Sequence, residues 1–337
     1  MVPRKMKYLF IGLGSIGQRH LKNLRAITQD TVLAYRTTTS NIDELNKKYD
    51  IKSYIDLEEA FDEKPDAVFV TNPTSLHMPM ALKAAAHNCH IFVEKPISHN
   101  LDHIDELYSL MQKNNKICFT GFNFRFHPNL MKIKELLDEK KIGKVLFARI
   151  QVGQYLPDWH PDKDYRKEYS ARKDLGGGVV LTLIHEIDYI YWLFGEIDSV
   201  FAFAEKLSSL EIDVEDTASI ILKTKNNAVV ELHLDYIQKP ATRTCEIVGK
   251  KGKIVWDYLK NEVKLFQTEE NRWMKYREKS FERNDMYVDE LNHFLKCING
   301  EEKQKITKKD VKEAMKIVEA VKKSSREEKK IYIREIS

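Results

Sequence analysis

Strands and helices alternate over the first 120 residues, and this alternation constrains the fold more than any other feature of the sequence. Short apolar runs typical of buried strands are separated by segments long enough to form a helix. The predicted strands are residues 7–11, 31–35, 52–55, 67–70, 90–93 and 117–120. Parallel neighbours need a crossover connection, which is usually a helix. The order therefore predicts an α/β fold with a doubly wound parallel sheet.

After residue 122 the pattern changes. Helices are predicted at 129–139, 179–194, 286–298 and 307–324. Strands are predicted at 144–151, 199–204, 217–224, 228–236, 245–248, 252–257 and 262–267. Consecutive strands, with the helices gathered apart from them, are typical of an α+β domain. We therefore expect one domain over residues 1–122 and a second over residues 123–337.

Composition agrees with a two-domain globular protein. At about 150 residues per domain, a chain of 337 residues corresponds to roughly two domains. The hydrophobic share of 42% is too high for a disordered chain. No stretch approaches the roughly 18 apolar residues of a membrane span. The formal net charge is only +4, with acids and bases interleaved, which argues against a nucleic-acid partner.

The cysteines and the first residues bear on compartment and metal content. Cys89, Cys118, Cys245 and Cys297 are too far apart to indicate a zinc knuckle or a disulfide framework. The cysteines and histidines also lack metal-ligand spacing. The sequence begins without the long apolar core of a secretory signal. We therefore expect a reduced, cytoplasmic protein with no bound metal and no membrane association.

A glycine-rich motif, Gly12-Leu-Gly14-Ser15-Ile16-Gly17, joins the first predicted strand to the first predicted helix. A lone match to G-x-G-x-x-G also fits a simple turn, but this position gives the motif a mechanism. Gly12 would permit the tight turn, Gly14 the approach of a pyrophosphate, and Gly17 the packing of helix on strand. The N-terminus of the helix, at Ser15 and Ile16, would supply N–H donors. The motif predicts dinucleotide binding.

The residues after the second predicted strand bear on which dinucleotide binds. An acidic side chain there would bind the adenosine ribose hydroxyls and favour NAD. The chain has Arg36, Thr37 and Thr38 instead. A guanidinium and two hydroxyls suit a 2′-phosphate, so NADP is the favoured cofactor. NAD stays the alternative, because an arginine stacked on adenine would be indifferent to the phosphate.

Two further motifs follow neighbouring strands. Asn72, Pro73 and His77 come after the strand at 67–70, and Glu94-Lys95-Pro96 comes after the strand at 90–93. In a doubly wound sheet both would lie at the carboxyl edge, where ligands bind. The proline after Lys95 favours an extended conformation at this residue.

In order and spacing these motifs resemble the Gfo/Idh/MocA family, named for glucose-fructose oxidoreductase and inositol dehydrogenase. The pattern is G-x-G-x-x-G, then T-x-P-T-x-x-H, then E-K-P. The resemblance continues through residues 121–128, 175–178 and 185–188 and so covers nearly the whole chain. It implies a Rossmann domain followed by an open, mostly antiparallel sheet. It also implies hydride transfer between a nicotinamide and a carbinol carbon, commonly of a sugar or cyclitol.

The resemblance implies roles for individual residues. Lys95 matches the family's catalytic lysine, which touches the reacting oxygen of the substrate. His185, within the apolar helix, aligns with the family's histidine and is the predicted proton acceptor or donor. The remaining predicted cofactor contacts are Asn72, Pro73, His77, Glu94 and Lys95.

One departure from the family matters for the chemistry. Polyol dehydrogenases of the family often carry Asp-x-x-x-His, but here Leu181 stands four residues before His185 and Thr182 three before. Thr182 or a residue from another element then has to contribute, or Lys95 and His185 suffice. Asp188 shares the helix face of His185 at i+3 and orients it, caps a loop or pairs structurally.

A loop dense in aromatic and polar residues is the predicted substrate-recognition segment. It carries Tyr155, Trp159, Tyr165 and Arg166. Sugars stack on aromatic rings, while polar groups fix their hydroxyls. A lid or a subunit contact is the alternative interpretation. Arg125 is a further substrate-binding candidate, or else holds the two domains together.

The sequence thus predicts an NAD(P)-dependent oxidoreductase acting on a sugar, cyclitol or nucleotide-sugar. The predicted substrate-binding residues are Lys95, Arg125, Tyr155, Trp159, Tyr165, Arg166, Thr182 and His185. A non-catalytic sensor of nucleotide or sugar, and a glycosidase with tightly bound NAD, are the alternatives. Exposed sheet faces in such domains often dimerise, so a homo-oligomer, dimer or tetramer, is expected.

Overall fold

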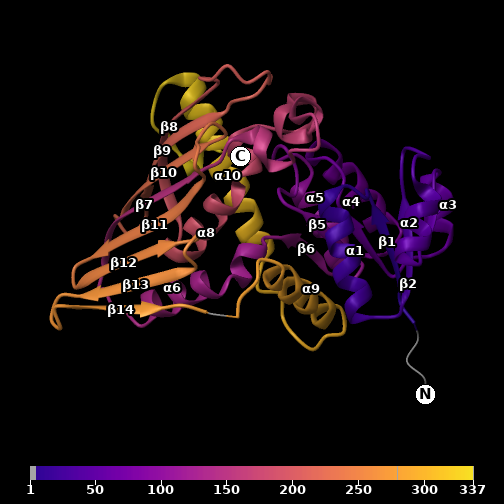
Figure 1. The fold of residues 1–337 in the computed structure, drawn as a ribbon, viewed down its shortest axis with the longest axis horizontal. Coiled ribbons are helices and arrows are strands. Elements are labelled where there is room, and N and C mark those ends of the chain that lie inside the picture. Colours follow the sequence, from indigo (N-terminus) through magenta and orange to yellow (C-terminus); the bar gives the residue numbers. More distant parts are fainter. Residues whose placement is uncertain (1–4, 279, 337) are drawn as a thin grey trace. The chain divides into compact units, whose positions relative to one another are not determined.

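The structure is a computed structural model that describes residues 5–278 and 280–336 (Figure 1). The chain forms two compact units. The first comprises Met1–Phe122 and Tyr287–Lys308, and the second comprises Asn123–Met286 and Lys309–Ser337.

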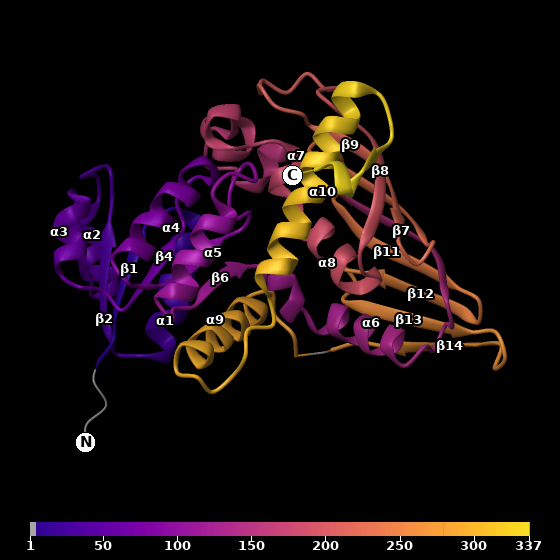
Figure 2. The ribbon, with the colours of Figure 1, turned by 180° about the vertical axis from the view of Figure 1, so that it is seen from behind.

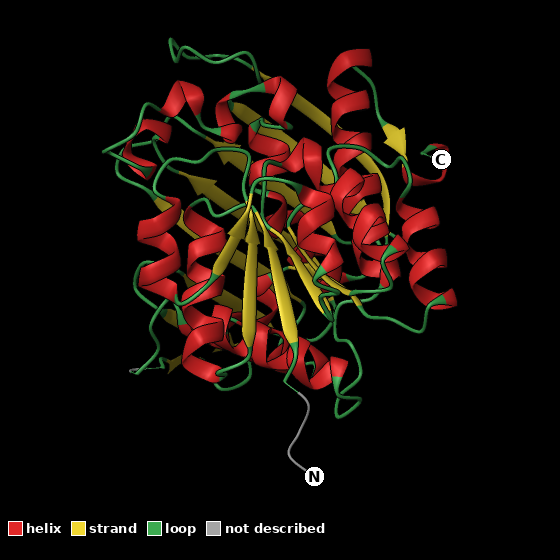
Figure 3. Cartoon of the chain, turned by 90° about the vertical axis from the view of Figure 1, so that its right-hand side faces the viewer, coloured by secondary structure: helices red, strands yellow, loops and turns green. Residues whose placement is uncertain are grey.

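The first unit contains a parallel sheet of six strands in the order β3-β2-β1-β4-β5-β6. The strands are β1 (Lys7–Ile11), β2 (Thr31–Tyr35), β3 (Lys52–Tyr54), β4 (Ala67–Val70), β5 (His90–Glu94) and β6 (Cys118–Gly121). The helices are α1 (Ser15–Ile27), α2 (Ile42–Tyr49), α3 (Leu57–Asp62), α4 (His77–Ala86), α5 (Ile104–Lys113) and α9 (Asp285–Ile298). Helices lie on both sides of the sheet (Figure 3). The predicted doubly wound sheet is confirmed.

A row of phenylalanine rings lies within the core of this unit. Phe69 of β4 stacks on Phe10 of β1 with centroids 4.5 Å apart and on Phe92 of β5 at 5.2 Å. Phe119 of β6 continues the row at 5.4 Å from Phe92. Phe294 of α9 meets the Phe69 ring edge-on at 5.6 Å. Phe294 is buried against these rings, which explains why α9 belongs to the first unit.

The place of α9 differs from the predicted limits. The second domain was predicted to run without interruption over residues 123–337, but residues 287–308 return to the first unit. Tyr287, like Phe294, packs on the first unit, where its ring lies 5.9 Å from that of His20 on α1. The return depends on contacts distant in sequence, which local patterns do not record.

The second unit contains a nine-stranded sheet in the order β14-β13-β12-β11-β7-β10-β9-β8-β15. The strands are β7 (Val145–Gly153), β8 (Ile197–Glu205), β9 (Thr217–Thr224), β10 (Val229–Asp235), β11 (Thr242–Gly249), β12 (Gly252–Asp257), β13 (Glu262–Gln267), β14 (Arg272–Tyr276) and β15 (Ile331–Tyr332). Only the β7–β10 pair is parallel among the described strands of this sheet. The predicted open, mostly antiparallel sheet is confirmed. β14, largely exposed, and β15, only two residues long, were not predicted because neither shows an apolar alternation.

Helices of the second unit gather on one face of this sheet. They are α6 (Pro128–Asp138), α7 (Val179–Thr182), α8 (Ile184–Phe194) and α10 (Lys308–Glu327). Figure 2 shows α6, α8 and α10 along that face. The predicted continuous helix 179–194 is interrupted at Leu183, whose φ of −97° and ψ of 30° separate α7 from α8.

The opposite face of the sheet carries large apolar side chains in solvent. Phe147 on β7 is 38% exposed, Ile221 on β9 51% and Phe203 on β8 52%. On the face covered by helices, residues such as Ile150 and Ile220 are buried. In the part of the chain that the structure describes, no helix is both long enough and apolar enough to cross a membrane.

Candidate functional site

The glycine-rich turn between β1 and α1 is closed on one side and open on the other. A Cβ on Gly17 would lie 2.4 Å from the carbonyl oxygen of Gly12, and one on Gly12 would lie 2.9 Å from the main chain of Asn72. Gly12 also has a φ of +96°, which other residues rarely adopt. A Cβ on Gly14 would meet nothing within 4 Å. The turn thus packs tightly through Gly12 and Gly17 while leaving space at Gly14, as a pyrophosphate requires.

The N-terminus of α1 begins at this open side. Ser15 and Ile16 are its first residues, Gly14 is its N-cap, and no side chain caps it with a hydrogen bond. The first N–H groups of a helix and its dipole favour an anion. These residues are therefore able to hold a dinucleotide in the predicted way.

Arg36 and Thr37 follow β2 on the same sheet. The main-chain N–H of Arg36 donates to the carbonyl of Tyr54, 3.0 Å away, which fixes the backbone at the strand end. Its guanidinium donates to the carbonyl oxygen of Ser40 at 2.7 Å. Arg36 is half-buried and Thr37 is exposed.

The turns after β4 and β5 lie at one edge of the sheet. The two strands are neighbours, with Val70 opposite Val93. Asn72 and Pro73 follow β4, and the half-buried Lys95 follows β5. Thr71 donates from Oγ1 to the carbonyl oxygen of Gly12 at 2.6 Å, so the turn after β4 is attached to the glycine-rich turn.

His77, the first residue of α4, has a main-chain partner on each side of its ring. The side chain, predicted to contact the cofactor, is buried, with Nδ1 2.7 Å from the carbonyl oxygen of Pro96 and Nε2 2.8 Å from that of Asn72. Both ring nitrogens are therefore engaged by main chain. Burial lowers the pKa of His77, although the two carbonyls act in the opposite direction.

Glu94 is likewise engaged inside the protein. Its Oε1 lies 2.6 Å from Nε2 of His20, which is fully buried on α1. Its Oε2 accepts the main-chain N–H of Lys95 at 3.1 Å. Burial acts to raise the pKa of Glu94, but the hydrogen bond and charge of His20, with the charge of Lys95, outweigh it and hold the pKa below its usual value. Glu94, a predicted cofactor contact, thus forms a buried pair with His20, which sequence reasoning missed.

In the second unit, His185 lies in the first turn of α8. It is 8% exposed, and its ring centroid lies 4.9 Å from that of Phe124. Thr182 is the last residue of α7 and is also buried. The break at Leu183 therefore falls between the two residues that the sequence placed on one continuous helix.

Arg125 has an internal structural partner. Its guanidinium binds both carboxylate oxygens of Asp188, with Nε 2.9 Å from Oδ2 and a terminal nitrogen 2.7 Å from Oδ1. The same nitrogen lies 3.1 Å from Asp310. Arg125, predicted to bind substrate or to join the two domains, is buried within the second unit. Asp188 thus has a structural partner, and structural pairing is one of the roles predicted for it.

The residue next to His185 is also paired. The carboxylate of Glu186 is fully buried, and its Oε1 lies 2.9 Å from Nε of Arg243 on β11. The guanidinium of Arg243 also lies 4.5 Å over the Phe124 ring. Both acids of α8 near His185 thus have arginine partners.

The loop carrying Tyr155 and Trp159 is held by the turn after β10. Tyr155 donates its main-chain N–H to the carbonyl of Gln238 at 2.9 Å, and the ammonium of Lys239 lies 4.1 Å over the Tyr155 ring. The Trp159 indole donates to the carbonyl oxygen of Gln154 and meets the Tyr236 ring edge-on at 5.4 Å.

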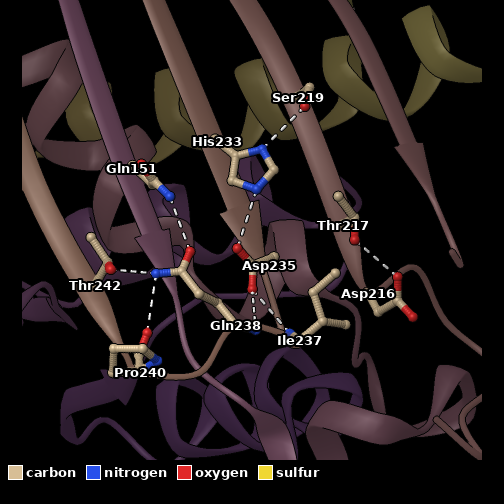
Figure 4. A network of polar contacts seen from close by, with 10 residues as sticks. All are labelled: Gln151, Asp216, Thr217, Ser219, His233, Asp235, Ile237, Gln238, Pro240 and Thr242. Atoms are coloured by element: carbon tan, nitrogen blue, oxygen red, sulfur yellow. Dashed lines mark hydrogen bonds and ion pairs between the residues drawn. The ribbon is translucent and has the colours of Figure 1, made fainter. Parts of the chain in front are cut away.

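That turn is itself fixed by a polar network (Figure 4). Oδ1 of Asp235 accepts the N–H groups of Ile237 at 2.9 Å and Gln238 at 2.8 Å. The side chain of Gln238 accepts from Gln151 at 3.0 Å and donates to the hydroxyl of Thr242. Sequence reasoning missed Asp235 and Gln238, because nothing local shows that they support the loop at 154–159.

Tyr165 and Arg166 lie farther along the loop. Arg166 is exposed and paired with Asp164 at 2.8 Å and Glu211 at 2.7 Å. The hydrogen bond from Arg166 lowers the pKa of Asp164. The hydroxyl of Tyr165 accepts the main-chain N–H of Glu211 at 3.2 Å. Both residues thus attach the loop to the segment before β9.

The four cysteines are buried and unpaired. Over residues 5–278 and 280–336, no group of three or more histidine, cysteine, aspartate and glutamate side chains is placed to hold a metal ion.

Comparison with known proteins identifies the family. Residues 6–122 match the oxidoreductase family with an NAD-binding Rossmann fold, and residues 130–255 match the GFO/IDH/MocA C-terminal domain. Myo-inositol 2-dehydrogenase of Thermotoga maritima is 31% identical over 98% of this chain and 99% of its own length. Levoglucosan dehydrogenase of Pseudarthrobacter phenanthrenivorans is 28% identical over 63% of this chain and 59% of its own.

Solved structures share the whole fold. Levoglucosan dehydrogenase in complex with NADH and levoglucosan has a TM-score of 0.87 at 20% identity, covering 98% of this chain and 100% of its own. The two matched regions and the full-length relative establish the family: the chain belongs to the Gfo/Idh/MocA oxidoreductases with an NAD-binding Rossmann fold.

Proposed function

We propose that this oxidoreductase transfers a hydride between a nicotinamide and a carbinol carbon of a sugar, cyclitol or nucleotide-sugar. The observation that carries the proposal is the position of Lys95. Lys95 follows β5 directly. The neighbouring strand, β4, is followed by the turn at Asn72, which packs on Gly12 of the glycine-rich motif. The 31% identity to an enzyme named myo-inositol 2-dehydrogenase supports a polyol substrate.

The first unit supplies the residues for the cofactor. The open side of Gly14 and the first N–H groups of α1 would hold the pyrophosphate. Asn72 and Pro73, after β4, would lie along the nicotinamide half. When bound, the nicotinamide supplies the hydride acceptor or donor.

Lys95 and His185 divide the remaining chemistry. In the oxidative direction, the ammonium of Lys95 steadies the substrate oxygen as negative charge develops on it. The imidazole of His185 accepts the hydroxyl proton. In the reductive direction Lys95 polarises the carbonyl and His185 returns the proton. Because Glu186 and Asp188 are both paired to arginines, we expect Lys95 and His185 to carry these steps without a carboxylate relay through α8.

The cofactor preference follows from Arg36. We propose that NADP is favoured over NAD, because a guanidinium and two hydroxyls follow β2 where a carboxylate would select NAD. The half-buried position of Arg36 and its bond to Ser40 hold the guanidinium close to the strand end.

The second unit supplies the candidate substrate contacts. Tyr155 and Trp159 offer rings for stacking against a sugar, and Thr182 offers a hydroxyl close to His185 in sequence. Tyr165 and Arg166 lie on the same loop, and Arg166 offers a cation for an acidic substituent or a diphosphate.

The exposed face of the nine-stranded sheet favours self-association. We propose that a second copy of the chain covers Phe147, Ile221 and Phe203. These apolar side chains are exposed together on one face of the sheet, and grouped exposed apolar residues mark interaction sites. A cytoplasmic homodimer or tetramer is the expected form. Replacing Ile221 with Asp would reduce its mass in analytical ultracentrifugation; an unchanged mass would contradict this interface.

The test of the activity compares wild type with Lys95→Ala. Reduction of NADP and NAD is followed at 340 nm with a panel of inositols, hexoses, anhydrosugars and nucleotide-sugars. Wild type should oxidise at least one of them, and Lys95→Ala should lower kcat by about 10²-fold or more while retaining cofactor affinity. Lys113→Ala, at an exposed position of α5, serves as the control. Cofactor binding without turnover of any compound would favour a sensor instead.

A further inference from the structure

We propose that His77 is a positioning residue that connects the turn packed on the glycine-rich motif to the main chain of Lys95, with one ring nitrogen serving cofactor binding and the other serving turnover. This inference rests on the proposed function for its second half only. Cofactor affinity tests the first half without any substrate.

The topology brings two loops within reach of one side chain. β4 and β5 are adjacent and parallel, so the segments after them leave the sheet at the same edge. His77 is the first residue of α4, which follows the turn after β4. From there the ring reaches the carbonyl oxygen of Asn72 with Nε2 and that of Pro96 with Nδ1.

At one end of this connection, Asn72 contacts the glycine-rich turn that is proposed to hold the cofactor (the cofactor turn). A Cβ on Gly12 would lie 2.9 Å from the Cα and N of Asn72, so the two main chains are in contact. Any shift of Asn72 therefore changes the space in which Gly12 makes its turn.

The Pro96 end leads to Lys95. The carbonyl of Pro96 is one peptide beyond Lys95, and the N–H of Lys95 is already held by the Glu94 carboxylate. The main chain of Lys95 is thus fixed on both sides, by Glu94 before it and by His77 after it. A displacement of about 1 Å at a catalytic group is enough to cost about 10²-fold in rate.

The His77 ring lies against two carbonyl oxygens, those of Pro96 and Asn72, and both can only accept a hydrogen bond. A neutral imidazole has one N–H and can donate to only one of the two carbonyls. Burial favours this neutral form, although the carbonyls of Pro96 and Asn72 and the charge of Glu94 oppose it and Lys95 supports it. In the neutral ring one contact is a hydrogen bond and the other is a packing contact, and each can be removed separately.

Asparagine or glutamine at position 77 would each keep one of the two contacts and remove the other. Asparagine places its NH₂ near the position of Nδ1 and so keeps a donor toward Pro96. Glutamine places its NH₂ near the position of Nε2 and so keeps a donor toward Asn72. The experiment measures the cofactor Kd by fluorescence titration, kcat at saturating cofactor, and Tm, for His77→Asn, His77→Gln and His77→Ala.

The proposal expects opposite effects of the two amides. His77→Asn should weaken cofactor binding about tenfold with kcat within about threefold of wild type. His77→Gln should lower kcat about tenfold or more with cofactor Kd within about threefold. His77→Ala should show both losses. If the two amides change Kd and kcat alike, in proportion to their loss of Tm, His77 is a core residue only and the proposal is wrong.

The controls separate this result from the broader proposal. His87→Asn and His87→Gln replace a half-exposed histidine at the C-terminal end of the same helix and should leave Kd and kcat unchanged. If wild type oxidises none of the sugars tested, the proposed activity fails. The tenfold difference in cofactor Kd between His77→Asn and His77→Gln still decides whether His77 positions the cofactor turn.

Discussion

Arg125 and Asp188 form a bidentate ion pair, with the Asp188 carboxylate completely buried. Arg125 comes from the segment after β6, and Asp188 lies one turn after His185 on α8. The pair therefore fixes the helix that carries the proposed proton acceptor. Arg125, offered by the sequence for substrate binding, and Asp188, offered for orienting His185, are thus each other's partners.

Removing Arg125 should destabilise the protein more than removing Asp188. Arg125→Leu leaves Asp188 as a buried charge without its partner, which costs about 3–5 kcal/mol. Asp188→Leu should cost less, because Asp310 still lies 3.1 Å from the guanidinium. Urea unfolding of both variants and of the double variant measures the difference. Equal losses for the two single variants would contradict the part assigned to Asp310.

Gly14 and Gly17 should respond in opposite ways to alanine. Gly17→Ala brings a Cβ within 2.4 Å of the Gly12 carbonyl oxygen, so the turn must move and both Tm and cofactor affinity should fall. Gly14→Ala meets no protein atom within 4 Å, so Tm should stay within a few degrees while cofactor affinity falls about tenfold. Thermal unfolding without cofactor and titration with NADP check both. A Gly14→Ala variant that binds NADP normally would exclude close approach of the pyrophosphate there.

The free energy of unfolding should decrease as the pH falls below about 6.5, in part because of His127. Its Nδ1 accepts the N–H of Asn129 at the start of α6, and burial, with the charge of Arg243, lowers its pKa to about 3. Between pH 6.5 and 3 the unfolded chain binds a proton here that the folded chain does not. One such proton changes stability by about 1.4 kcal/mol per pH unit. The contribution is complete above pH 6.5 and is lost toward pH 3.

His127→Asn should reduce this dependence. The amide oxygen can still accept the Asn129 N–H, but the side chain does not titrate. Urea unfolding at several values between pH 4.5 and 7 should give a shallower slope than wild type. His87→Asn, at a half-exposed position, should keep the wild-type slope. Identical slopes for wild type and His127→Asn would show that His127 is not held neutral.

The first unit could be predicted closely because its signals are local. The apolar run at residues 7–11 coincides with β1, and the glycines after it produce the turn that their spacing indicates. In each case a few adjacent residues determine the backbone.

The features that were missed depend on contacts between distant residues. His20 and Glu94 are 74 positions apart and form a pair only after α1 packs on the sheet. The return of α9 to the first unit rests on Phe294 and its ring contacts. The interruption at Leu183 has no local signal either, because leucine and its apolar neighbours favour a continuous helix.

Cofactor preference should depend on Arg36. Arg36→Ala should lower kcat/KM with NADP by about tenfold or more, because a charge-assisted bond to the 2′-phosphate is lost. The value with NAD should change by less than about threefold. Lys47→Ala, an exposed position on α2, provides a control for loss of one positive charge. A wild-type protein with equal or higher kcat/KM for NAD would refute the preference.

Substrate affinity should depend on Gln238, which binds the loop of Tyr155 and Trp159 through its main chain and is itself held by Gln151 and Thr242. Gln238→Leu removes the side-chain contacts but leaves the main-chain carbonyl that accepts from Tyr155, so the loop should loosen without unfolding. KM for the sugar should rise about tenfold, while kcat and the cofactor Kd stay within about threefold. Ile237→Ala, at the neighbouring 40% exposed position, keeps its N–H bond to Asp235 and should behave as wild type. If Gln238→Leu keeps the wild-type KM, the loop at 154–159 does not position the substrate.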